Sequence, residues 1–216
     1  MPTIKILLSS YTEPSSSGAV SGQVINPSNA YTDINSTTYA TIDSEFDSNG
    51  TFETSASCFK FSLTDIPKGA KINSATIKVK CYFNVTGSRI NEPYLELTYG
   101  SARPTLGTIP YSQMGTVQTF SKELSSAAIN NFLVNKTSLS LWLECSASPY
   151  TGETCDVTVR LYGAELIVDY TPQINGYANI DGVNKELTGG YVNIGGAWKE
   201  LVGGYINIGG VWKEMS

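Results

Sequence analysis

From residue 24 to residue 171 the chain alternates between apolar and polar positions, with interruptions at clusters of Gly, Pro, Asn and Asp. A period of two is typical of strands that bury one face. The clearest predicted strands are 57–63, 75–85, 94–99, 138–145 and 155–170, and weaker ones are expected at 23–25, 39–42, 52–54 and 116–120. Residues 125–134 have the pattern of one short helix, with Ser125 as a candidate N-cap.

The last long strand contains an interruption of its own. In "CDVTVRLYGAELIVDY" the apolar positions are odd-numbered up to Leu161 and even-numbered from Ala164 onward. One extra residue at Gly163 shifts the alternation in this way, which predicts a β-bulge. A long bent strand among nine or ten strands indicates an all-β fold: a jelly-roll-like sandwich over residues 23–171 with one short helix.

The first 22 residues differ in pattern from the sandwich. "TIKILLS" has the composition of a short strand, and "SSYTEPSSSGAVSG" is small, polar and typical of a linker. We therefore expect residues 1–22 to form an N-terminal arm or attachment segment. Its strand either lies at a sheet edge of its own domain, the favoured interpretation, or docks on another subunit.

Residues 172–216 contain a 14-residue repeat in three copies: "YANIDGVNKELTGG", "YVNIGGAWKELVGG" and "YINIGGVWKEMS". Each copy predicts a β-hairpin turning at Asp-Gly or Gly-Gly, and the three together predict a six-stranded meander. If Ile194 opposes Ala197, then Tyr191, Asn193, Trp198 and Glu200 share one face. The equivalent residues of the third copy are Tyr205, Asn207 and Trp212. These aromatic residues either pack the hairpins, the slightly favoured interpretation, or form a repeated sugar site.

Composition narrows the classes of function. With 41% apolar and 15% charged residues, the 216-residue chain can build a proper core. The net charge is −5 and the basic residues are scattered, which argues against nucleic-acid partners. No apolar run is long enough for a membrane helix, and "MPTIKILLSS" is too short for a signal-peptide core, so we expect cytoplasmic synthesis without secretion.

The residues that could perform chemistry are few. The chain has no histidine, which removes Ser-His-Asp and Cys-His nucleophile systems. The carboxylates of Glu92, Glu96, Glu123, Glu144 and Asp156 are not paired by their spacing. Of the four cysteines, Cys81, Cys145 and Cys155 have the phase of buried residues, whereas Cys58 is expected to face away from the core. We therefore expect no enzyme, no metal site and no cofactor.

Three aromatic residues of the sandwich lie out of phase with its core. Tyr82, Tyr94 and Trp142 occupy outward positions on three separate predicted strands. If those strands share a sheet, the three rings form an aromatic platform suited to a glycan.

Several segments resemble known families. "FKFSLTDIPKGAKINSATIKVKC" is similar to the signature of the disaggregatase-related, DNRLRE-type β-sandwich domains, which are regarded as carbohydrate-binding and are common in surface and virion proteins. "VRLYGAELIVDYT" looks like the closing strand of sandwich domains in tailed-phage structural proteins, and the GxWK repeats resemble the C-terminal repeats of phage tail proteins.

These resemblances imply a non-enzymatic structural protein of a tailed-bacteriophage virion. It would decorate the tail, baseplate or capsid surface and contact host-surface glycan. Its partners would be other virion proteins and further copies of itself, with no membrane. One alternative is a purely structural cement or oligomerisation protein. Another is a glycan-binding module of a bacterial surface enzyme or adhesin.

Overall fold

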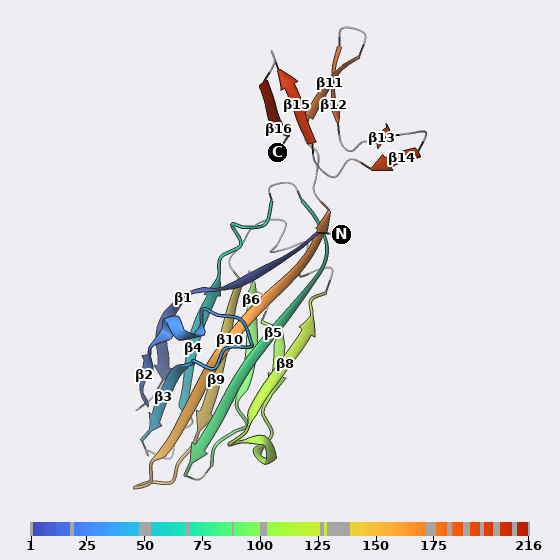
Figure 1. The fold of residues 1–216 in the computed structure, drawn as a ribbon. Coiled ribbons are helices and arrows are strands. Elements are labelled where there is room, and N and C mark those ends of the chain that lie inside the picture. The colour runs from blue at the N-terminus through green and yellow to red at the C-terminus, as the bar shows by residue number, and fades with distance from the viewer. Residues whose placement is uncertain are drawn as a thin grey trace.

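The computed structural model of the chain consists mainly of antiparallel strands (Figure 1). It describes residues 2–17, 20–47, 53–67, 70–87, 89–99, 103–125, 128 and 139–171, and the backbone of six short strands between residues 176 and 215. Within these residues no helix is long and apolar enough to span a membrane. The predicted all-β sandwich is confirmed.

Ten strands form two facing layers. The first layer has the order β2 (Val20–Ile25), β3 (Ala40–Phe46), β10 (Cys155–Thr171), β5 (Lys71–Thr86) and β8 (Val117–Glu123). The second has the order β4 (Glu53–Phe61), β9 (Leu139–Ala147), β6 (Tyr94–Tyr99) and β7 (Thr105–Thr108). Two 3-10 turns, η1 (Pro27–Ala30) and η2 (Tyr111–Gln113), lie in the connections. The strands predicted at 52–54 and 57–63 are one strand, β4; the other predicted strands of the sandwich are present, and β7 is an addition.

One strand, β1 (Thr3–Ser17), belongs to both layers. Its first part, Thr3 to Leu7, pairs with β10, and the part from Leu8 to Ser17 pairs with β4. The prediction that residues 1–22 form a separate arm is therefore wrong. The favoured expectation of an edge strand in its own domain is confirmed, because among the described strands each part of β1 pairs on one side only. The small polar residues pair through their backbone, and the register shifts between Thr12 and Ser15, around Pro14, which has no N–H to donate.

The predicted bulge in β10 is confirmed. Leu161 pairs with Cys81 and Gly163 with Lys80, so Tyr162 is the extra residue. A β-carbon on Gly163 would lie 2.5 Å from the carbonyl oxygen of Thr32, which explains the glycine. On one side of β10 the bulge marks a change of neighbour: β3 pairs with the strand before it and β1 with the strand after it.

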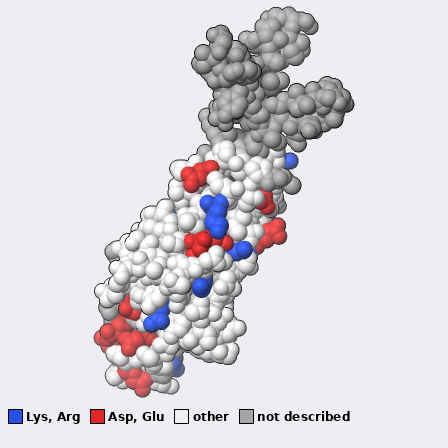
Figure 2. Space-filling model, viewed as in Figure 1, with Lys and Arg blue, Asp and Glu red and all other residues white. Residues whose placement is uncertain are grey.

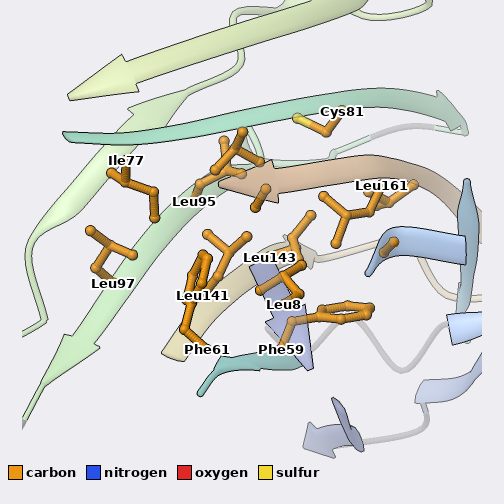
Figure 3. Packing of buried hydrophobic residues seen from close by; sticks show 14 of the residues in the cluster. Leu8, Phe59, Phe61, Ile77, Cys81, Leu95, Leu97, Leu141, Leu143 and Leu161 are labelled. Atoms are coloured by element: carbon orange, nitrogen blue, oxygen red, sulfur yellow. The ribbon is translucent and has the colours of Figure 1, made fainter. Parts of the chain in front are cut away.

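The two layers meet in one apolar core (Figure 3). Phe59 and Leu141 enter it from the second layer, and Ile77 and Leu161 from the first. Fully burying one such side chain contributes about 1.5–3 kcal/mol. Cys81, Cys145 and Cys155 belong to this core as predicted, and all four cysteines are free.

The predicted helix falls mostly outside the described residues. Ala128 is helical, and its backbone N–H donates to Ser125 Oγ at 3.2 Å. This is the contact that an N-cap residue makes, which agrees with the assignment of Ser125. The remainder of the predicted helix, including residues 129–134, lies outside the described residues.

The C-terminal repeats form three hairpins. They pair β11 (Gly176–Ile180) with β12 (Val183–Leu187), β13 (Tyr191–Ile194) with β14 (Ala197–Glu200), and β15 (Gly204–Ile208) with β16 (Val211–Met215). One hairpin per 14-residue copy was predicted and is confirmed. Among the described strands, however, no pairing joins one hairpin to the next, so three two-stranded sheets replace the predicted six-stranded meander.

Candidate functional site

The outer face of the second layer brings two of the three predicted platform residues together. Tyr94 on β6 pairs in register with Glu144 on β9, and Glu96 on β6 pairs with Trp142 on β9. Residues two apart on a strand point to the same side, so all four side chains share one face. The connection between β6 and β7 adds Arg103. We call Tyr94, Glu96, Arg103, Trp142 and Glu144 the Trp142 cluster.

Arg103 joins the members of this cluster. Its Nη2 atom lies 2.9 Å from Glu96 Oε2 and also contacts Glu144 Oε1. Its guanidinium lies over the indole ring of Trp142, with Cζ 5.6 Å from the ring centroid. The Arg103 guanidinium therefore forms ion pairs with two carboxylates and a cation–π contact with one aromatic ring.

The two carboxylates of the Trp142 cluster are largely buried, so burial and neighbouring charges shift the pKa values in the cluster. Only 15% of the Glu96 side chain and 14% of the Glu144 side chain are exposed, whereas 52% of Arg103 is exposed. Removal from water raises the pKa of Glu96, and the negative charge of Glu144 raises it further, although Arg103 opposes both effects. Tyr94 Oη donates to Glu144 Oε2 at 2.6 Å, and this hydrogen bond is the main cause that raises the pKa of Tyr94 to about 12.

Trp142 carries an unsatisfied donor. Its Nε1 atom is buried and has no hydrogen-bond partner among the described residues. A buried indole N–H normally finds an acceptor, because an unpaired one costs about 1–3 kcal/mol. The cluster thus combines an indole ring, a buried unpaired donor and two carboxylates, the kinds of group that hold the apolar face and hydroxyl groups of a sugar.

Cys58 lies beside this cluster, on the same face of the second layer. It pairs in register with Trp142 from the neighbouring strand β4 and does not belong to the core cluster, as expected from its phase. It is nevertheless only 3% exposed, and burial raises the pKa of its thiol. Cys58 therefore faces away from the core as predicted, but its neighbours on the outer face bury it.

Tyr82, the third predicted platform residue, lies elsewhere. It is on β5 in the first layer, where the guanidinium of Arg160 lies 5.0 Å from its ring centroid. Arg160 also lies 5.1 Å from the ring of Tyr39. Tyr82 therefore stacks with Arg160 on the opposite layer from β6 and β9. The predicted three-residue platform is reduced to Tyr94 and Trp142.

The repeat residues have the predicted register. Tyr191 pairs with Glu200 and Asn193 with Trp198 in the second hairpin, and the third repeats this register. Its equivalent pairs are Tyr205 with Glu214 and Asn207 with Trp212. The side chains of the repeats lie outside the described residues, so the sugar-site and packing interpretations both stay predictions.

The described part of the first layer contains a hollow. A cavity of about 530 Å³ is lined by residues of β2, β3 and β10, among them Asp43, Glu45 and Asp156. Figure 2 shows acidic side chains gathered toward that end of the sandwich. Among the described residues, no group of three or more His, Cys, Asp or Glu is placed to hold a metal ion.

Sequence reasoning missed how Glu96, Arg103 and Glu144 come together. Glu96 follows Tyr94 by two positions and Glu144 follows Trp142 by two, so the alternation that identified the aromatics also applies to the carboxylates. Arg103 lies in a connection, where no period constrains its direction. No family model matches the chain, and no curated protein matches it.

Proposed function

We propose that the protein is a non-enzymatic structural component of a bacteriophage virion, displayed on the particle surface, where it contacts host-cell glycan. The observation that carries the glycan part is the Trp142 cluster, which places an indole, a phenol and hydrogen-bonding charges on one sheet face. The virion part is supported by the resemblance of the closing strand and the GxWK repeats to phage structural proteins.

The same cluster favours binding over catalysis. A glycosidase uses two carboxylates separated by about 5–10 Å, with the sugar between them. Here a single nitrogen of Arg103 contacts both Glu96 and Glu144. Both carboxylates are engaged by the same guanidinium, so neither is free to act as a separate acid or base.

The second candidate function is that of a cement protein whose hairpins join copies of the chain. The pairing of β13 with β14 and of β15 with β16 supports it, because among the described strands neither hairpin pairs with another. Unpaired strand edges are templates for pairing with a further chain.

A binding assay with fragments of host cell wall distinguishes glycan contact from the cement function. We expect the full-length protein to bind, and Trp142→Ala to reduce binding at least roughly tenfold, as loss of an anchoring aromatic does. Tyr82→Ala is the matched control, because it removes an aromatic residue from the opposite layer. Trp198→Ala tests whether the repeats bind glycan or only assemble the protein.

The results decide between the candidates. Loss of binding in Trp142→Ala with unchanged assembly supports glycan contact. A parent protein that binds no wall glycan, combined with loss of assembly in Trp198→Ala, would leave the cement function in its place.

A further inference from the structure

The Trp142 cluster contains more negative than positive charge. Glu96 and Glu144 are both largely buried, and Arg103 is the one cation that contacts them among the described residues. Two carboxylates that share one guanidinium leave a net charge of one negative unit when both are ionised. Because a buried charge is costly unless it is paired, this surface attracts a further cation or a stronger one.

Arg103 is the least fixed member of the cluster. It comes from the connection between β6 and β7, whereas the other four members project from strands. About half of its side chain, 52%, is exposed. A long side chain on a connection can turn away when an incoming cation takes over its contacts with the carboxylates, and its place beside the indole is then open to that group.

The unpaired N–H of Trp142 indicates that a ligand replacing Arg103 has a hydrogen-bond acceptor. Arg103 has donors and no acceptor, so it cannot satisfy the indole Nε1–H. A ligand that replaces Arg103 fully needs a cation for the carboxylates, an oxygen for the indole donor and an apolar face for the ring. A hexosamine with a free amino group has all three: an ammonium, neighbouring hydroxyl oxygens and the C–H face of its pyranose ring.

We propose that Glu96, Glu144 and Trp142 form a cation site, occupied by Arg103 in this structure, that accepts the protonated amine of a hexosamine unit in the bound glycan. This inference rests on the proposed glycan contact and specifies its chemistry. Arg103 is then an internal competitor for the site and not a sugar-binding residue.

Two kinds of ligand test the selectivity. The full-length protein is titrated with a β-1,4-linked glucosamine tetramer and with its fully N-acetylated counterpart, which has the same rings without the positive charge. We expect the free-amine tetramer to bind at least ~10-fold more tightly, the size of one charge-assisted hydrogen bond. Glu96→Gln and Glu144→Gln should each remove this preference, and Glu123→Gln, an exposed carboxylate on β8, should not.

Arg103→Gln tests the competition directly. If Arg103 occupies the site, its removal uncovers the carboxylates and the indole, and binding of the glucosamine tetramer tightens several-fold. If Arg103 itself holds the sugar, the same change weakens binding. Circular dichroism and thermal unfolding of each variant show that the sandwich remains folded, and Arg103→Lys keeps the charge as a second test with intermediate affinity expected.

The outcomes separate this inference from the proposed function. Equal affinity for the two tetramers, weaker binding by Arg103→Gln, or binding only to other wall glycans would each overturn the cation site and leave glycan contact standing. Absence of binding to both tetramers and to every wall glycan would overturn both.

Discussion

A β-carbon built on Gly163 would lie 2.5 Å from the carbonyl oxygen of Thr32 and 2.7 Å from that of Asp33. The opposing atoms belong to backbone, and Thr32 Oγ1 donates to the carbonyl of Tyr162 at 3.2 Å, which holds the loop against the bulge. We therefore expect Gly163→Ala to lower the free energy of unfolding by about 2–3 kcal/mol, the upper range for overpacking. Urea denaturation measures it.

Gly152→Ala is the control for this change. Gly152 has a φ of +91°, and an added β-carbon there would meet nothing within 4 Å. Its cost is limited to backbone strain of about 1 kcal/mol. An equal loss in the two variants would show that the contact with Thr32 is not the cause.

Glu96 gives a second residue-scale prediction, on pH. Its folded pKa lies above the model-compound value of 4.5, chiefly because of burial. The groups that face it are Tyr94 on its own strand, Glu144 on β9 and Arg103 from the connection; β7 supplies none. A raised carboxyl pKa means that the folded state holds the proton more tightly, so ionisation of Glu96 lowers stability as pH rises through its folded pKa.

Glu96→Gln should consequently raise the midpoint of urea unfolding at pH 7. The gain should shrink as pH falls through the folded pKa of Glu96 and vanish below about 4.5, where the carboxyl is protonated in both states. Unfolding of both proteins across this pH range measures it. A gain that does not change with pH would point to a cause other than the charge. Stabilisation of a variant that has lost ligand preference is the expected signature of a binding residue.

At the residue scale, alternation correctly predicted which way side chains point on the strands. It did not predict the position of side chains on connections or the burial that comes from packing. The phase of β10 located Gly163, and the phases of β6 and β9 placed Tyr94 and Trp142 outward. Arg103 lies between Tyr99 and Thr105, where side-chain direction follows no period. The burial of Cys58 depends on the bulk of its neighbours on the outer face, which phase does not report.

At the scale of elements, β1 determines how the two layers are joined. Ile6 and Leu8 are both 2% exposed and enter the core on either side of the point where the strand changes partner. The sequence "SSYTEPSSS" indicates a linker by composition, yet its backbone supplies β4 with a neighbour. Composition describes side chains, whereas strand pairing uses the N–H and C=O groups that every residue but proline carries.

Leu8→Ala tests the place of β1 in the core. Truncating a buried leucine costs about 2–5 kcal/mol, and we expect a loss in that range in chemical denaturation. Ser10→Ala, an exposed position two residues further along the same strand, should stay within about 0.5 kcal/mol of the parent. A loss below 1 kcal/mol for Leu8→Ala would mean that the first strand contributes little to the sandwich.

At the scale of the whole molecule, the core that the structure describes belongs to the sandwich. In the part of the chain whose burial is described, the core cluster extends from Ile6 to Val168. The repeats were predictable because turn chemistry is local: Asp-Gly and Gly-Gly pairs fix a hairpin without help from the rest of the chain. Pairing between hairpins is not local, and the expected meander was wrong at that step.

Removal of residues 172–216 tests whether the sandwich is stable without the repeats. An isolated two-stranded hairpin is marginally stable, so three separate ones add little to the stability of the sandwich. We expect the chain 1–171 to unfold in one transition with a free energy within about 0.5 kcal/mol of the full protein, the usual range for changes away from the core. A larger loss would mean that the hairpins pack on the sandwich.

Because the Trp142 cluster lies wholly within 94–144, the shortened chain should also keep its preference for the free-amine tetramer, while any avidity supplied by the repeats on a glycan surface is lost.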